Sequence, residues 1–225
     1  MKSLTDKLNY QFTDPKLLVA ALTHPSYGSD HSVPHYQRLE FLGDAVLQLA
    51  VTRLLFDQYA GVDEGRLTRA RAAIVCEASL YEAAKRISLG DAIYLSVGEE
   101  RSGGRDKPSI LSDALEAVFA AVYLDGGMEE ATRVIRTALG RQLTVEAADE
   151  RIDYKSQLQI RLQKEKGADP VYRLAGTEGA PHMPQFTMQV LLLDQVLGEG
   201  TGRSKQAAQQ RAAQMALEKL VQGTI

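Results

Sequence analysis

The pattern of apolar and polar positions changes once along the chain, and the change separates a long helical part from a short part with strands. In the first part, residues 38–59 and 110–124 are apolar on nearly every side, which predicts two helices at the centre of a core. Further runs predict flanking helices at 4–10, 15–22, 67–86 and 128–143. We expect a polar loop at 28–34 and a polar, mobile segment between Gly90 and Gly104.

The second part begins after the polar, acidic stretch 144–153. A helix is predicted at 154–166, and an alanine-rich helix is expected at 203–221. Between them, runs separated by glycine-rich turns predict three strands, at 171–174, 185–193 and 195–197. The expected fold is therefore multidomain, with an all-α domain (1–145), a linker (146–153) and a small α+β domain of αβββα order (154–223).

Composition excludes several classes of protein. The 225 residues are 44% hydrophobic, which is enough for a core and argues against global disorder. The single Cys76 excludes an intramolecular disulfide and a thiolate cluster, which fits a reducing compartment. Because the N-terminus lacks a signal-peptide pattern and no run has the length of a membrane span, we expect a cytoplasmic protein.

Charge gives a weak indication of where an anionic partner binds. The whole chain has a formal net charge of −3 at pH 7, and residues 1–145 alone also carry −3. Residues 154–225, in contrast, carry +3. This mild asymmetry favours the C-terminal domain as the part that meets an anion.

Two pairs of carboxylates lie on the two central helices. Glu40 and Asp44 are spaced i, i+4, and Asp113 and Glu116 are spaced i, i+3, so each pair shares a helix face with about 5–6 Å between Cβ atoms. An isolated pair of this kind is more often a solvated surface feature, but these helices are too apolar to be surface elements. Like charges in a core repel, and a hard cation with oxygen ligands, such as Mg²⁺, would compensate them. The sequence therefore predicts a carboxylate metal site.

The residues around these acids resemble a known family. The run Arg-Leu-Glu-Phe-Leu-Gly-Asp-Ala-Val-Leu at 38–47 looks like the signature of the ribonuclease III family, and 109–117 is similar to that family's other catalytic stretch. The segments 63–65 and 107–111 also fit. The αβββα tail resembles a double-stranded RNA-binding domain, so the resemblance covers essentially the whole chain in the order of the bacterial enzyme.

The resemblance implies a homodimeric endonuclease that hydrolyses double-stranded RNA with Mg²⁺, or Mn²⁺ as a substitute, and uses no small-molecule cofactor. Its products would carry 5′-phosphates and short 3′ overhangs, as in the processing of rRNA, mRNA and tRNA precursors. By position, the metal ligands would be Glu40, Asp44, Asp113 and Glu116, with Asp44 and Glu116 as the catalytic residues. Phe41 matches an aromatic side chain that inserts into the partner subunit.

The same resemblance assigns RNA contacts to Glu64, Lys107, Gln159, His182, Arg203 and Lys205. Arg203 and Lys205 lie at the start of the last helix, where the helix dipole and unpaired backbone N–H groups also favour phosphate. A-form RNA presents 2′-hydroxyls in a wide minor groove, which Gln159 and His182 could reach. Simpler interpretations remain open for two of these residues, because Glu64 could be a turn-flanking acid and Lys107 a solvated loop charge.

The chain departs from the family pattern at several positions. Tyr36-Gln37 precede the acidic motif where many members have Asn-Glu, at the helix entrance. In the binding domain, Gln206 stands where a second Lys is customary, Met183 where a Lys is common and Ile160 where a Glu is usual. These changes predict weakened RNA affinity and leave the acidic site untouched.

Two other functions are compatible with parts of this sequence. A non-cleaving regulator could keep the dimeric nuclease-like core and bind duplex RNA, but all four carboxylates are intact. A metal-dependent phosphohydrolase for small molecules could use residues 1–145 alone, but the duplex-binding tail argues against it.

Overall fold

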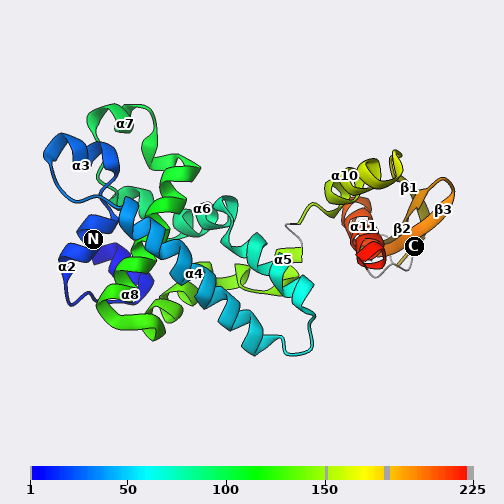
Figure 1. The fold of residues 1–225 in the computed structure, drawn as a ribbon, viewed down its shortest axis with the longest axis horizontal. Helices are drawn as coiled ribbons and strands as arrows, with labels where there is room; N and C mark the ends of the chain where they lie inside the picture. Colours follow the sequence, from blue (N-terminus) through cyan, green and yellow to red (C-terminus); the bar gives the residue numbers. More distant parts are fainter. Residues whose placement is uncertain (1, 150–151, 180–182, 222–225) are drawn as a thin grey trace. The chain divides into compact units, whose positions relative to one another are not determined.

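The computed structural model describes residues 2–149, 152–179 and 183–221. Its contacts divide the chain into two compact units, Met1–Arg151 and Ile152–Ile225. Figure 1 shows the first unit as packed helices and the second as a small sheet with two helices. The predicted fold, an all-α domain followed by an αβββα domain, is confirmed.

The described part of the first unit is built from helices of very different lengths. Their bounds are α1 (Lys2–Leu8), α2 (Pro15–Ala21), α3 (Pro25–His31), α4 (Gln37–Gln58), α5 (Glu64–Val75), α6 (Glu77–Arg86), α7 (Val97–Arg101), α8 (Pro108–Leu139) and α9 (Val145–Asp149). Short 3₁₀ turns lie at η1 (Leu89–Ala92), η2 (Gly104–Asp106) and η3 (Gly140–Gln142). Several helices begin where a side chain accepts a hydrogen bond from a first-turn N–H group, as Asp14, Asp63 and Ser96 do.

Helices α4 and α8 form the centre of this unit and cross in Figure 1. They meet at Gly43, where an added Cβ would lie 1.9 Å from the backbone oxygen of Glu116. A side chain at position 43 would therefore push the two helices apart. This close approach brings the first turns of α4 next to the first turns of α8, and both predicted acid pairs stand there.

Helix α8 bends where the sequence predicted one helix to end and another to begin. Gly127 has φ 82° and ψ −177°, so the backbone is not helical at that residue. Just before it, the Asp125 carboxylate accepts hydrogen bonds from the Tyr10 hydroxyl and from the backbone N–H groups of Thr13 and Asp14, each at 2.8 Å. These contacts fasten the chain between α1 and α2 to the bend.

Three expectations for the first unit were wrong in detail. The predicted helix 67–86 is two helices, because Cys76 is extended (φ −71°, ψ 156°) and separates α5 from α6. The expected loop 28–34 is partly helical, since His24 accepts from the N–H of Ser26 and begins α3. The segment between Gly90 and Gly104 contains α7 and is held by Arg105, whose guanidinium donates to two backbone oxygens of that segment.

The segment 146–153, expected to be a linker, begins with helix α9. Val145 and Ala148 are buried, and α9 packs against α5. The Arg66 guanidinium pairs with Asp149 at 2.6 Å and so fixes α9 from the α5 side. The helical unit therefore continues beyond residue 145, because the acidic stretch carries apolar residues spaced for one helix face.

The second unit has the predicted order of elements. It contains α10 (Tyr154–Lys166), β1 (Val171–Glu178), β2 (Gln185–Leu192), β3 (Gln195–Gly202) and α11 (Lys205–Val221). The strands form one antiparallel sheet in the order β1-β2-β3, with α11 packed on β2 and β3 and α10 packed on α11. Three glycines of β3, Gly198, Gly200 and Gly202, lie so close to the α11 backbone that an added Cβ would clash. β3 is longer than predicted, because these glycines belong to the strand rather than to a turn, and β1 also continues beyond the predicted 171–174 to Glu178.

Candidate active site

Four carboxylates gather where α4 and α8 cross. Glu40 and Asp44 come from α4, and Asp113 and Glu116 come from α8. Glu40, Asp113 and Glu116 are partly buried, whereas Asp44 is exposed. Since Gly43 lies against the backbone of Glu116, the crossing itself places the two pairs beside each other.

Burial, and then neighbouring negative charges, raise the pKa values of three of these groups. Burial, and then the negative charges of Asp44, Asp113 and Glu40, raise the pKa of Glu116 to about 8. Burial and Asp113 raise the pKa of Glu40. Burial and the charge of Glu77 raise the pKa of Asp113, while a hydrogen bond with Ser112 opposes them. The cluster therefore carries negative charge in a partly desolvated place, which favours a cationic partner.

The donor set suits a hard cation, but it is not a preformed coordination sphere. Four carboxylates offer the oxygen ligands that Mg²⁺ and Mn²⁺ prefer. Within the described ranges, no three or more His, Cys, Asp or Glu side chains are arranged so that they could hold a metal ion as they stand. The acids are electrostatic neighbours, and side-chain rotation would be needed before they shared one ion.

Tyr36 belongs to this site, although its sequence position indicated only the helix entrance. Its side chain is 2% exposed and its ring meets the His24 ring edge-on, with centroids 5.6 Å apart. Burial, and then the charges of Asp113, Glu40 and Glu99, raise the pKa of its hydroxyl. The phenol therefore lies close to acids of the cluster and also to Glu99. The sequence feature that could have identified Tyr36 as part of this site is its position just before the acidic motif.

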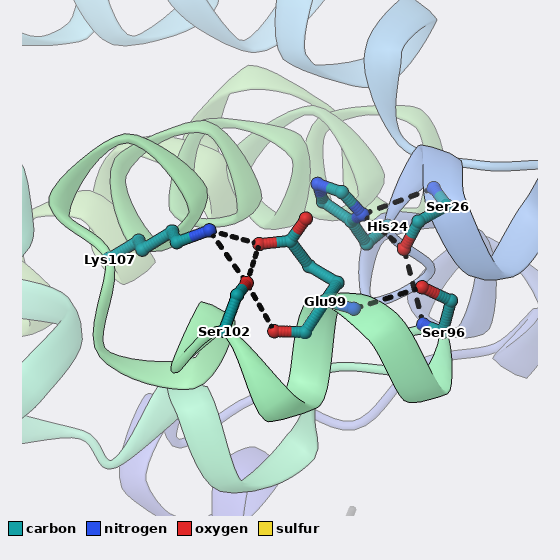
Figure 2. Close-up of polar contacts among 6 residues, drawn as sticks. All are labelled: His24, Ser26, Ser96, Glu99, Ser102 and Lys107. Carbon is teal, nitrogen blue, oxygen red and sulfur yellow. Dashed lines mark hydrogen bonds and ion pairs between the residues drawn. The ribbon is translucent and has the colours of Figure 1, made fainter.

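Lys107, a predicted RNA contact, lies immediately before α8 and is held by the preceding segment. Its ammonium donates to Glu99 Oε1 at 2.5 Å and to Ser102 Oγ at 2.9 Å, as Figure 2 shows. Glu99 is on α7 and was not identified from the sequence. The hydrogen bond from Lys107 is the main reason that the pKa of Glu99 is lowered.

Phe41 stands on the exposed side of α4, directly after Glu40. Its side chain is 84% exposed, and two further residues of α4, Leu49 and Phe56, are 60% and 69% exposed. The spacing of eight and seven residues places the three on one helix face, which we call the α4 apolar stripe. Leu49 was expected in the core, so the sequence pattern missed this surface.

The other predicted RNA contacts that lie within the described residues are at exposed positions. Glu64 begins α5 and accepts a hydrogen bond from Thr68 at 2.9 Å, and Gln159 on α10 donates to Asp169 at 3.2 Å. Arg203 and Lys205 are exposed at the start of α11, where Gln206 is exposed too. His182 lies outside the described residues. Ile160 and Met183, two departures from the family pattern, are 70% and 69% exposed.

Comparison with known proteins decides the family. Residues 14–143 match the family model described as Ribonuclease-III-like, and residues 154–220 match the double-stranded RNA binding motif. A Ribonuclease 3 of Bacillus cereus is 42% identical over 222 residues, which cover 97% of this chain and 91% of that protein. The chain belongs to the ribonuclease III family of double-stranded RNA endonucleases. A Ribonuclease 3 of Bacillus anthracis has the same identity and coverage.

Solved structures of ribonuclease III agree with the helical unit. Two structures of the nuclease domain of the Campylobacter jejuni enzyme are 45% identical to this chain, with TM-scores of 0.59 and 0.58. They cover 63% and 62% of this chain, and 96% and 92% of the solved chains.

Among its described residues, this ribonuclease III family member has no helix long and apolar enough to cross a membrane.

Proposed function

We propose that this protein hydrolyses double-stranded RNA with Mg²⁺ at the crossing of α4 and α8, leaving 5′-phosphates and short 3′ overhangs. The observation that carries the proposal is the position of Glu116, partly buried among three other carboxylates, with a pKa of about 8. Such repulsion costs stability unless a cation relieves it. The RNA-binding motif of the second unit supplies the substrate class.

Glu40, Asp44, Asp113 and Glu116 are the residues that would hold the metal. Bound Mg²⁺ would supply Lewis acidity at the phosphate and lower the pKa of water. Near neutral pH, Glu116 holds a proton for much of the time and must lose it before it can act as a ligand. Asp44, the exposed member, is the carboxylate most open to solvent. Water attack with departure of the 3′-oxygen keeps the phosphate on the 5′ end.

Contacts from both units would hold the duplex. Arg203 and Lys205 are exposed at the start of α11, where cationic side chains and unpaired N–H groups favour phosphate. Gln159 and His182 would reach the minor grooves. Glu64 and Lys107 would lie along the path of the RNA in the helical unit. The proposed cellular reactions are the processing of rRNA, mRNA and tRNA precursors.

The decisive experiment is incubation of the protein with a long RNA duplex, with Mg²⁺, with Mn²⁺ or with EDTA. We expect discrete shorter products on a denaturing gel with either metal and none with EDTA. The 3′ ends of the products should be ligated to an RNA adapter, and the 5′ ends should carry a phosphate that phosphatase removes. Intact RNA in the presence of Mg²⁺, together with duplex binding, would instead support the non-cleaving regulator.

We further propose that the α4 apolar stripe pairs with the same stripe of a second copy. Phe41 would insert into the partner subunit, and exposed apolar side chains of this size favour such an interface. The Campylobacter jejuni nuclease domain is itself described with a region involved in dimer formation.

Phe41→Ala should weaken this dimer by about 3–5 kcal/mol, the usual cost of deleting a large buried aromatic side chain. Sedimentation over a range of protein concentrations would measure the change. Val97→Ala, which removes another exposed apolar side chain, on α7, is the matched control and should leave the dimer intact. A wild-type protein that is monomeric at micromolar concentration would rule out the interface.

A further inference from the structure

The Lys107 ammonium is fixed by two side chains and still has a donor to offer. It donates to Glu99 and to Ser102, as Figure 2 shows, and an ammonium carries three N–H groups. The Lys107 side chain is 42% exposed and that of Glu99 is 23% exposed. The pair therefore lies at the surface, where the third donor can reach a ligand from solvent.

Glu99 is itself held in place by a chain of contacts from α3. Its backbone N–H donates to Ser96 Oγ at 3.2 Å, and the Ser96 N–H donates to Ser26 Oγ at 3.1 Å. The Ser26 N–H in turn donates to His24 Nδ1 at 3.1 Å. Figure 2 shows these residues joining the start of α3 to α7 and then to Lys107. These contacts fix the backbone of Glu99 and so the position from which its carboxylate extends.

The Glu99–Lys107 pair flanks the acid cluster. Lys107 directly precedes α8, on which Asp113 lies six residues later, and the Tyr36 ring, one turn before Glu40, meets the ring of His24, where the chain of contacts to Glu99 begins. The hydrogen bonds that Lys107 donates to Glu99 and Ser102 give its ammonium a defined place at the start of α8.

We propose that Glu99, assisted by Ser102, is a positioning residue that holds the Lys107 ammonium beside the acidic site so that its third N–H binds a phosphate of the RNA duplex. This inference rests on the proposed function, because the duplex must reach the acidic site. An ion pair with this partial exposure contributes only modestly to stability. The other role to be tested is that Glu99 neutralises Lys107 and keeps it from RNA.

A double-mutant cycle on the full chain tests the proposal. Binding of a fluorescent RNA duplex would be measured in EDTA, which prevents metal-dependent cleavage, over a series of KCl concentrations. Lys107→Met should weaken binding roughly three- to fivefold and reduce the salt slope by about one. Glu99→Gln should weaken binding in the wild type and have no effect in the Lys107→Met background. Ser102→Ala should weaken duplex binding less than Glu99→Gln does, and it too should have no effect in the Lys107→Met background.

A charge swap separates positioning from structural support. In Glu99→Lys/Lys107→Glu the ion pair remains, so thermal unfolding should match the wild type, but binding should stay as weak as in Lys107→Met. Arg133→Met is the matched control, because Arg133 pairs with Glu130 on α8 at similar exposure and should leave the salt slope unchanged.

Several outcomes would overturn the proposal. They are tighter binding in Glu99→Gln, full recovery of binding in the swap, or an effect of Glu99→Gln that persists without Lys107. An unchanged Kd and slope in Lys107→Met, with a wild type that binds and cleaves duplex RNA, would refute this inference alone. A wild type that neither binds nor cleaves duplex RNA would refute the proposed function as well.

Discussion

Two of the carboxylates on helix α8 lie in opposite electrostatic surroundings. Glu116 stands in the acid cluster, where burial and three negative neighbours raise its pKa to about 8. Asp125 stands at the bend, where burial is the largest single influence and raises its pKa, but hydrogen bonds from Asp14, Thr13 and Tyr10 together outweigh burial and lower the pKa. The described part of the protein thus stabilises the charge of Asp125 with its own donors and leaves the charge of Glu116 to a partner.

This difference distinguishes acids that maintain the fold from acids that perform chemistry. Asp125 fastens the chain before α2 to α8, and its ionised form contributes to stability. Glu116 and its neighbours repel each other, which a fold alone would not retain. Metal binding would reverse that repulsion, so the same residues can be unfavourable in the metal-free protein and favourable in the working enzyme.

The largest expected effect comes from removing the charge of Glu116. Glu116→Gln should lower the cleavage rate by roughly a hundredfold or more, since it removes one carboxylate from the metal site. Duplex binding should change little, because the RNA-binding motif lies in the second unit. Gel assays at limiting Mg²⁺ would measure cleavage, and binding in EDTA would measure affinity. If Glu116→Gln cleaves at the wild-type rate under limiting Mg²⁺, the assignment of Glu116 to the metal site is wrong.

The next test changes the helix crossing without touching a carboxylate. In Gly43→Ala the new Cβ would lie 1.9 Å from the Glu116 backbone oxygen, so α4 and α8 must separate. We expect a loss of about 1–3 kcal/mol in the free energy of unfolding and a fall in cleavage. Denaturant unfolding and gel assays would measure both. Gly61→Ala is the control, because nothing lies within 4 Å of its added Cβ.

The sequence predicted the acid pairs because helical spacing is a local property. Residues three or four apart share a helix face in any helix, so the Glu40/Asp44 and Asp113/Glu116 pairs could be read without a structure. The αβββα order could also be predicted, since strand and helix patterns differ in period. In both cases the information lies within a few neighbouring residues.

What the sequence did not predict depends on contacts between distant segments. The role of Gly43 requires knowledge that Glu116 crosses behind it, and the pairing of Lys107 with Glu99 requires the fold of α7. Likewise, Leu49 was expected in the core because apolar character alone does not show which side of α4 is covered. The break at Cys76 has no glycine or proline to mark it.

The pH dependence of stability should reveal the raised pKa of Glu116 in metal-free protein. The folded pKa of about 8 exceeds the ordinary value of 4.5, so the folded state holds the proton more tightly than the unfolded state. Stability should therefore fall as pH rises from about 4.5 to about 8 and level off above it. Denaturant unfolding in EDTA would follow this fall, which Glu116→Gln should reduce. An identical pH profile in the two proteins would contradict the assignment.

The smallest expected effect has the opposite sign with pH and concerns Asp125. Its pKa is below the ordinary value of 3.8, so its contribution to stability is full above that value and is lost as pH falls through the lower, folded pKa. Asp125→Asn turns one acceptor oxygen into a donor that faces other donors, which should cost about 1 kcal/mol at neutral pH. The difference from wild type should begin to shrink below about pH 4, where the carboxyl of the unfolded wild-type chain becomes protonated, and should be lost below the folded pKa. Cleavage should remain close to the wild-type rate, because Asp125 lies at the bend of α8 and not in the acid cluster. A large loss of cleavage with unchanged stability would show that the two carboxylates do not divide fold and chemistry in this way.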